Sequence, residues 1–198
     1  DPAETWRDVE RKQDKIVEYL NKVDKIHVIG EDTDLTLSVK DRPWVNCCGH
    51  KNLPDGEVFT SPLEESINGH IRFTYPGIYQ GKEIENIYLE FKDGKVVKGT
   101  ADKGQELLDT ILTIEGADLV GEFAIGTNYG VQTFTKSILF DEKMGGTMHM
   151  ALGRGFPDTK SQNQDCVIHW DILKDMKTED SKVIADEKVI YQAGKWLI

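Results

Sequence analysis

The motif His169-Trp170-Asp171 carries two side chains that can bind a metal ion or exchange a proton. Residues two apart in a strand point to the same face, so a strand here would present the imidazole and the carboxylate side by side, with Trp170 on the opposite face. This pair suits a divalent cation or a hydrogen-bonded His–Asp pair. A solvated histidine beside a surface aspartate is the simpler interpretation, and the motif alone does not decide between them.

Three further residues have settings that suit metal binding. His149 follows the pair Gly145-Gly146, where the backbone can approach closely, although a histidine among apolar residues is often a hydrogen-bonded core residue. Glu122 interrupts an apolar run, and a buried carboxylate costs several kcal/mol unless it is paired or bound to metal; otherwise it faces solvent from an edge strand. Glu57 follows the turn Asp55-Gly56, which can present a ligand or simply a surface glutamate.

The elements that must position these residues are predicted from hydrophobic periodicity. Helices are expected over residues 4–23, over residues 103–111 with Asp102 as a cap, and over residues 135–139. Strands are expected over residues 26–30, 35–39, 58–60, 71–100 with a hairpin turn at Asp93-Gly94, 120–125, 166–173 and 182–195. Residues 42–62 otherwise form a loop. Because strands outnumber helices without regular alternation, we expect a single α+β domain with a mixed, largely antiparallel sheet and a few packed helices.

Composition excludes several classes of function. The chain has 198 residues, with 24 basic residues against 35 acidic ones and a formal net charge of −11 at pH 7. Such a surface repels phosphates, which argues against binding to nucleic acid or to an anionic membrane. The longest apolar runs are only a few residues, well short of the roughly 20 that cross a bilayer. The three cysteines, Cys47, Cys48 and Cys166, do not suggest a disulfide framework, which favours reduced thiols in the cytoplasm.

Five segments, considered together, resemble one family. They are residues 30–35 (GEDTDL), 54–62 (PDGEVFTSP), 121–128 (GEFAIGTN), 141–149 (DEKMGGTMH) and 168–171 (IHWD), in this order. Together they resemble the thermophilic metalloaminopeptidases, the family of aminopeptidases T and S. The resemblance implies a two-metal site with the ligands Glu57, Glu122, His149, His169 and Asp171. It also implies that Glu122 bridges the ions and serves as a candidate base, and that Glu142 is a second catalytic carboxylate.

This resemblance implies a metal-dependent aminopeptidase that removes the N-terminal residue of peptides through a hydroxide activated by two metal ions. Oxygen and imidazole ligands without thiolates favour two divalent ions such as Zn, Co or Mn. The expected partners are peptide substrates and a second copy of the chain in a homodimer. The alternative is a catalytically weak or inactive metal-binding domain of the same family. A hydrolase using Cys166 and His169 is disfavoured, because a three-residue offset on one strand places them on opposite faces.

The resemblance is incomplete at two points. Phe156 stands where the family motif implies a tyrosine that assists the reaction intermediate, and losing such a donor costs on the order of 10²–10³ in rate. Either Tyr129 or another group supplies the donor, or activity is reduced. The resemblance also implies a preceding N-terminal domain, which is absent from this chain. Residues 1–198 would then be the C-terminal catalytic domain, with a helix over residues 1–24.

Overall fold

The strands are short, with at most seven residues each, and the helix α1, with 19 residues, is the longest element. The computed structural model describes residues 1–198, except for the side chain of Pro2. In chain order the elements are α1 (Pro2–Leu20), β1 (Lys25–Gly30), β2 (Thr33–Ser38), β3 (Val45–Cys47), β4 (Glu57–Thr60), β5 (Asn68–Arg72), β6 (Gly77–Tyr79), β7 (Lys82–Ile84), β8 (Tyr88–Lys92), β9 (Lys95–Thr100), α2 (Gln105–Leu112), β10 (Val120–Gly126), α3 (Ile138–Asp141), β11 (Thr147–Gly153), the 3-10 turn η1 (Pro157–Thr159), β12 (His169–Asp175), β13 (Lys182–Ala185), β14 (Lys188–Gln192) and β15 (Lys195–Trp196).

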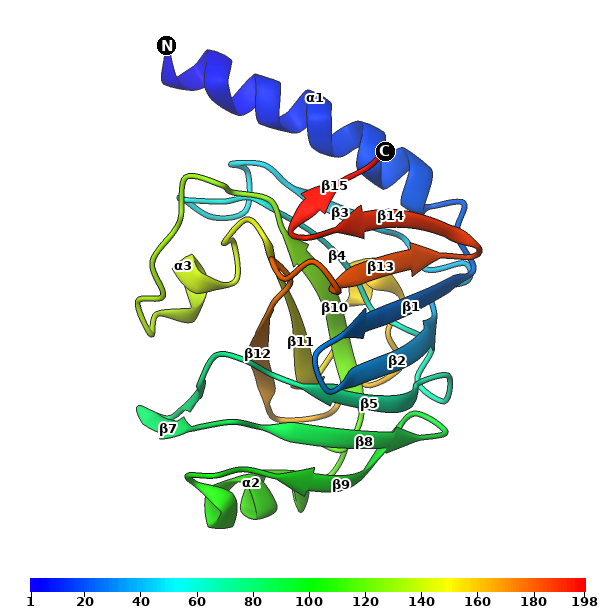
Figure 1. The fold of residues 1–198 in the computed structure, drawn as a ribbon, viewed down its shortest axis with the longest axis vertical. Coiled ribbons are helices and arrows are strands. Elements are labelled where there is room, and N and C mark those ends of the chain that lie inside the picture. Colours follow the sequence, from blue (N-terminus) through cyan, green and yellow to red (C-terminus); the bar gives the residue numbers. More distant parts are fainter.

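The strands form two large sheets and one small hairpin (Figure 1). The larger sheet has the strand order β15-β14-β13-β1-β2-β5-β8-β9, and the five-stranded sheet has the order β12-β11-β10-β4-β3. The hairpin pairs β6 with β7. Every pairing between the named strands is antiparallel. The five-stranded sheet therefore places segments from residue 45 to residue 175 next to one another.

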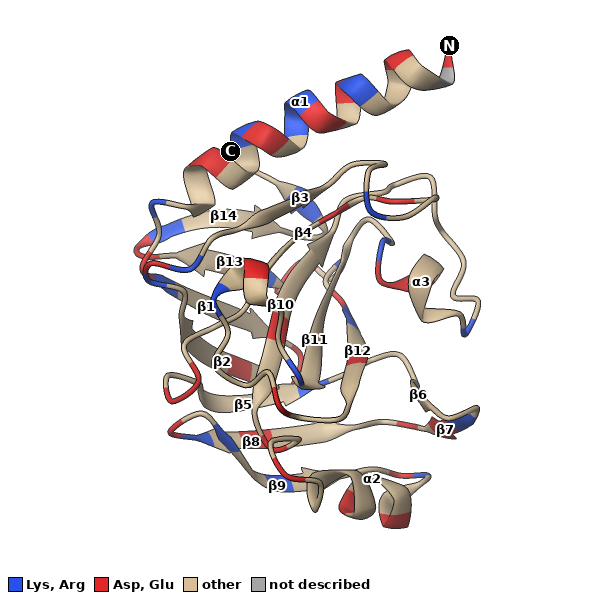
Figure 2. Cartoon of the chain, turned by 180° about the vertical axis from the view of Figure 1, so that it is seen from behind, with Lys and Arg blue, Asp and Glu red and all other residues tan. Residues whose placement is uncertain are grey.

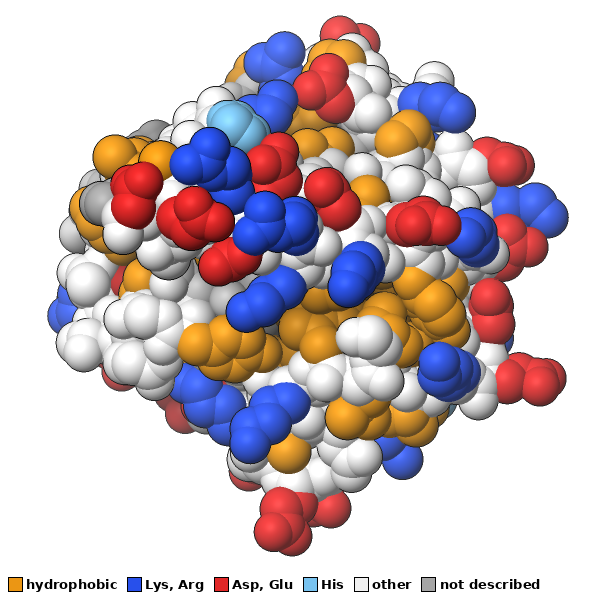
Figure 3. All heavy atoms as spheres, turned by 90° about the horizontal axis from the view of Figure 1, so that it is seen from above, with side chains coloured by type: hydrophobic (Ala, Val, Ile, Leu, Met, Phe, Trp, Pro, Cys, Tyr) orange, Lys and Arg blue, Asp and Glu red, His pale blue; other side chains and the backbone are white. Residues whose placement is uncertain are grey.

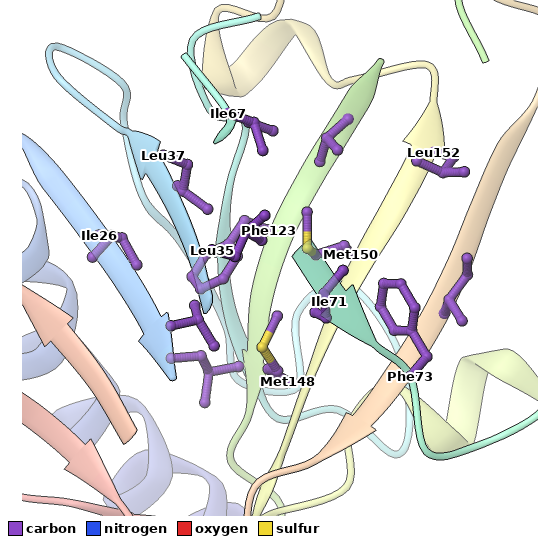
Figure 4. Close-up of a cluster of buried hydrophobic side chains, with 14 of the residues drawn as sticks. Ile26, Leu35, Leu37, Ile67, Ile71, Phe73, Phe123, Met148, Met150 and Leu152 are labelled. Atoms are coloured by element: carbon purple, nitrogen blue, oxygen red, sulfur yellow. The ribbon is translucent and has the colours of Figure 1, made fainter. Parts of the chain in front are cut away.

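The hydrophobic core lies between these two sheets (Figure 4). Phe123 from β10 and Met148 and Met150 from β11 meet Leu35 from β2 and Ile71 from β5, and all five side chains are fully buried. Burying one such side chain stabilises the fold by about 1.5–3 kcal/mol. The core thus uses one face of the five-stranded sheet and leaves the other face for other side chains.

The helix α1 lies across one end of the sheets, next to β15 (Figure 1). Asp1 caps its start, because the Asp1 carboxylate accepts a hydrogen bond of 3.1 Å from the backbone N–H of Ala3. Ile16 and Leu20 join the core from the buried side of the helix. From this end, charged side chains of both signs surround apolar ones (Figure 3). The helix also packs against β3 and β4, close to the loop that joins these two strands.

Most of the predicted architecture is confirmed: a single compact α+β domain with mostly antiparallel sheets. The hairpin turn is where it was expected, between β8 and β9. Asp93 and Gly94 have φ values of +48° and +86°, which fit the type I′ turn. Within the described residues, none of the helices combines the length and apolar character needed to cross a bilayer.

Several local predictions are wrong. Asp102 does not cap α2; Gly104, in the left-handed conformation with φ 82°, precedes the helix, and the Asp102 carboxylate accepts a hydrogen bond from Asn86 Nδ2 instead. The helix expected from residue 135 begins at Ile138, and the strand expected from residue 166 begins at His169. The expected loop over residues 42–62 also contains β3, whose pairing with β4 is non-local.

Candidate metal centre

The residues predicted as ligands come from neighbouring strands of the five-stranded sheet and lie on one face of it. Residues paired across antiparallel strands point to the same side. Ala151 of β11 pairs with Glu122 of β10 and with Asp171 of β12, so these two carboxylates share a face. His149 lies two residues before Ala151, and His169 lies two residues before Asp171. The strand period therefore places both imidazoles on the face of the two carboxylates.

Glu57 reaches the same face from β4. It pairs with Gly126, which lies four residues after Glu122 on β10 and so on the same side of that strand. Phe123, which follows Glu122 on β10, and Met150, which follows His149 on β11, point the other way, into the core between the sheets. Seen from behind, acidic positions lie on β10 and on β12, the two strands that flank β11 (Figure 2). One face of this sheet is thus apolar core, and the other gathers the predicted ligands.

Glu122 is at the centre of the cluster. His149 Nε2 lies 3.4 Å from Glu122 Oε1, and His169 Nε2 lies 3.2 Å from Glu122 Oε2. The two oxygens of this carboxylate therefore face two different histidines. His149 Nε2 is also 3.3 Å from Glu57 Oε2, and His169 Nε2 is 3.3 Å from Asp171 Oδ1. The arrangement consists of two groups of ligands that share Glu122.

Burial shows that this polar cluster needs a partner. Glu57 and Glu122 are 4% exposed and His149 is 0% exposed. Within the described residues, Glu57 Oε2, both ring nitrogens of His149 and Asp171 Oδ1 are buried and make no hydrogen bond. Such orphaned groups cost about 1–3 kcal/mol each, and more when charged. The ligand atoms of Glu57, Glu122 and His149 lie within 4.8 Å of one another, as do those of Glu122, His169 and Asp171. These residues fit divalent cations.

Lys143 is a buried cation in the cluster, and its place there is not predicted by the sequence. Its ammonium lies 2.5 Å from Glu57 Oε1, 2.6 Å from Glu142 Oε1 and 3.9 Å from Asp55 Oδ1, and the residue is 1% exposed. Glu142, predicted as a catalytic carboxylate, follows α3 and is therefore brought to the site beside Glu57. A third group of possible ligand atoms within 4.8 Å comprises Glu142, His149 and Asp171.

The charges in the cluster perturb its titration. Burial lowers the pKa of His149, but the Glu122 and Glu57 carboxylates outweigh burial and hold this pKa well above its ordinary value. Burial also lowers the pKa of His169, while Asp171 and Glu122 raise it, with a net rise to about 11. Burial and then the charge of Glu57 raise the pKa of Glu142 to about 7. Without metal ions, protons on the histidines offset part of the negative charge.

Groups around the cluster hold the ligands in place. The carbonyl oxygen of Arg154 lies 2.6 Å from His169 Nδ1, which directs Nε2 towards Glu122 and Asp171. The amide of Gln13, on α1, donates to the carbonyl oxygen of Glu57 at 2.9 Å, and this side chain is 2% exposed. The helix is therefore joined directly to the strand that carries one ligand.

Phe156 lies beside the cluster. Its ring centroid is 5.0 Å from that of His169 and 5.3 Å from that of Phe59. It contacts a predicted ligand but cannot donate a hydrogen bond. Tyr129 does not supply the missing donor, since its hydroxyl donates to the carbonyl oxygen of Gly194 at 2.8 Å. Cys166 precedes β12 and, within the described residues, makes no hydrogen bond to His169.

A buried set of imidazoles and carboxylates on one face of an antiparallel sheet is typical of proteins that bind a divalent metal ion through oxygen and nitrogen atoms. The chain belongs to the thermophilic metalloprotease (M29) family, whose model matches residues 1–196. It is 28% identical to aminopeptidase 2 of Geobacillus stearothermophilus over an alignment 229 residues long, which covers 99% of this chain and 55% of that protein. It is 30% identical to aminopeptidase T of Thermus thermophilus, over 100% of this chain and 55% of that protein.

Solved structures show the same fold. Wild-type AmpT from Thermus thermophilus matches with a TM-score of 0.86 and 26% identity, over 100% of this chain and 56% of that chain. A 2,5-dihydroxypyridine dioxygenase from Pseudomonas putida matches with a TM-score of 0.71 and 18% identity, a likeness of fold alone. The chain spans about half the length of the curated relatives it matches. The family is one of metalloproteases, and the curated relatives named above are aminopeptidases.

Proposed function

We propose that this chain is the metal-binding domain of an aminopeptidase and that it holds two divalent ions bridged by Glu122. The observation that carries the proposal is that the two Glu122 oxygens face two different histidines, at 3.4 and 3.2 Å. Glu57, Glu122 and His149 would hold one ion. Glu122, His169 and Asp171 would hold the other. Oxygen and imidazole ligands suit Zn, Co or Mn.

The charge of the cluster supports two ions rather than one. Five buried carboxylates lie around Lys143 or among the histidines, those of Asp55, Glu57, Glu122, Glu142 and Asp171. With neutral histidines and ionised carboxylates, the single ammonium leaves four negative charges. Two divalent cations would neutralise them, which a buried site requires.

Bound ions would polarise the scissile carbonyl and lower the pKa of an attacking water. Glu142 is suited to move the proton, because its carboxylate lies within 4.8 Å of the donor atoms of His149 and Asp171 and is not one of the residues proposed to hold the ions. Glu122 would serve mainly as a bridging ligand, since both of its oxygens already face histidines. The net charge of the chain, −11 at pH 7, would favour the approach of the N-terminal ammonium group of a peptide.

The test is chelation of the 198-residue chain, with hydrolysis of aminoacyl-arylamides as the assay. We expect a chelator to abolish hydrolysis and added cobalt or zinc to restore it. Glu122→Gln is the matched variant and should fail to recover with either metal. Full activity in the presence of chelator would exclude the metal mechanism.

A metal-binding domain without turnover is the second candidate, favoured by Phe156 beside His169, which offers no hydrogen bond to an intermediate. Calorimetric titration with metal, paired with the hydrolysis assay, separates the two candidates: tight binding without hydrolysis supports the second.

We also propose a homodimer and a cytoplasmic location. Three free, buried cysteines support a reducing compartment, and sedimentation of the chain tests the dimer.

A further inference from the structure

We propose that Glu10, Cys48 and His50 form a second metal site, specific for a zinc-like ion, that fastens α1 to the loop preceding Glu57. None of these three residues belongs to the cluster around Glu122. One ligand comes from the helix, and the other two come from the loop between β3 and β4. An ion here would therefore join two parts of the chain separated by about forty residues in the sequence.

The donor atoms already converge. One ligand atom each from Glu10, Cys48 and His50 lie within 4.8 Å of one another. His50 Nε2 lies 3.4 Å from Glu10 Oε1, close enough to share an ion. Cys48 is 4% exposed and is a free thiol, so its sulfur is shielded from solvent on the protein side of the site. His50 and Glu10 lie on the solvent side of the site, with side chains 71% and 40% exposed.

The loop is held in the shape that the site requires. The Asp55 carboxylate accepts hydrogen bonds from the backbone N–H groups of Gly49 at 2.7 Å, and of Lys51 and Asn52 at 3.3 Å each. Gly49 has a φ of +98°, and a Cβ there would lie 3.1 Å from the ring of Trp6. The helix therefore packs directly on the loop between its two ligands. Such preorganisation lowers the cost of ordering the ligands when an ion binds.

The donor set selects the ion. A thiolate, an imidazole and a carboxylate together suit Zn²⁺, which binds sulfur, nitrogen and oxygen, whereas Mg²⁺ and Ca²⁺ require oxygen ligands. As the ion binds, the Cys48 S–H bond breaks, an S–metal bond forms and the proton passes to solvent. Three protein ligands leave a fourth tetrahedral position for water. The carboxylates of Glu10 and Asp55 keep this region favourable for a cation.

An ion at this site would affect the cluster around Glu122 through the loop between β3 and β4. Residues 48–56 lead directly into Glu57, and Asp55 lies both under this loop and 3.9 Å from Lys143. On the helix, Gln13 holds the Glu57 carbonyl. An ion between α1 and the loop would stabilise both supports of Glu57 without contacting the cluster itself.

The test is a titration of the 198-residue chain with Co²⁺, followed by absorption spectroscopy. Cobalt bound to a thiolate gives a sulfur-to-metal charge-transfer band, which the oxygen and imidazole ligands around Glu122 do not produce. We expect the band in the unmodified chain and its loss in Cys48→Ser. His50→Asn and Glu10→Gln should weaken cobalt binding at this site by at least the roughly 10–100-fold that follows loss of a supporting group. Circular dichroism checks that each variant folds.

Matched variants locate the thiolate. Cys166→Ser removes a buried thiol elsewhere and should retain the band. Glu122→Gln disrupts the cluster around Glu122 and should also retain the charge-transfer band, which separates this proposal from the proposed peptidase function. Absence of the band in the unmodified chain overturns the proposal. A band that survives Cys48→Ser but disappears in Cys47→Ser also overturns the proposal. Cys47 lies on β3 opposite Glu57, so this result would place the thiolate at the cluster around Glu122.

Discussion

Replacing Lys143 with methionine should destabilise the metal-free protein far more than the metal-loaded protein. Methionine fills a similar volume but removes the charge that lies 2.5 Å from Glu57 and 2.6 Å from Glu142. Those two carboxylate oxygens are then within about 5 Å of each other, with no cation between them. The substitution leaves the fold's apolar packing largely intact and tests electrostatics.

The magnitude follows from the distances. Well above pH 7, where both carboxylates are ionised, two unit charges about 5 Å apart repel by about 3 kcal/mol at an effective dielectric constant of about 20. Removing one partner from a buried ion pair generally costs about 3–5 kcal/mol, which agrees. For a domain of this size, that loss lowers the melting temperature by about 6–20 °C. Bound divalent ions would supply the missing positive charge, so the loss should be smaller in excess zinc or cobalt.

The assay is thermal unfolding followed by circular dichroism, in chelator and in excess metal. Lys98→Met is the matched control, because Lys98 pairs with Glu90 on the surface at 2.7 Å and its replacement should change little. An unchanged melting temperature for Lys143→Met in chelator would refute the assignment of Lys143 as the compensating cation. An equal loss with and without metal would refute the idea that ions share its role.

Three further predictions address pH, turnover and support. In the folded protein the pKa values of His149 and His169 are raised above 6.5, their value in the unfolded chain, so protonation of these histidines stabilises the metal-free fold. This contribution is complete below pH 6.5 and is lost as the pH rises towards about 11, the pKa of His169 in the folded protein. Urea unfolding in chelator should therefore show stability falling with pH across this window, and a flat profile contradicts the assignment. Phe156→Tyr should increase aminoacyl-arylamide hydrolysis, by up to about 10²–10³ if the hydroxyl reaches the intermediate, and unchanged turnover would remove Phe156 as the limiting residue. Gln13→Ala should destabilise the chain by about 1–3 kcal/mol, measured by urea unfolding, because it leaves the buried carbonyl of Glu57 without this donor; no loss would mean that α1 does not support β4.

The sequence predicted the site and its strands best where the energy or conformation of neighbouring residues alone limits the possible structures. Glu122 sits in an apolar run, and an unpaired carboxylate is costly to bury, so a buried position there predicted a partner or a metal ion, with an exposed edge strand as the alternative. The two-residue spacing of His169 and Asp171 required a shared face once β12 formed. The pair Asp93-Gly94 defined its turn because both residues tolerate positive φ. These inferences needed only neighbours in the chain.

The missed residues depend on contacts that are remote in the sequence. Lys143 follows Asp141-Glu142, a charge run that is typical of a solvated surface, and it is buried where its ammonium meets Glu57 of β4. Gln13 lies among charged helix residues, yet it reaches the carbonyl of Glu57, 44 positions away. The strand β3 has three residues in a segment rich in Gly, Pro and Asn, and only its pairing with β4 makes it a strand. Long-range packing decided each case, so local patterns carried no signal.

Gly121 shows how backbone geometry controls the site. The pairing of β10 with β11 shifts register between Val120 and Glu122, so Gly121 is an extra residue in a bulge that sets the face on which Glu122 emerges. A one-residue slip would turn Glu122 into the core. A Cβ at residue 121 would lie 2.3 Å from the carbonyl oxygen of Arg154, the same oxygen that lies 2.6 Å from His169 Nδ1. The bulge that orients the central carboxylate and the carbonyl that orients a histidine are therefore in direct contact, and only glycine allows both.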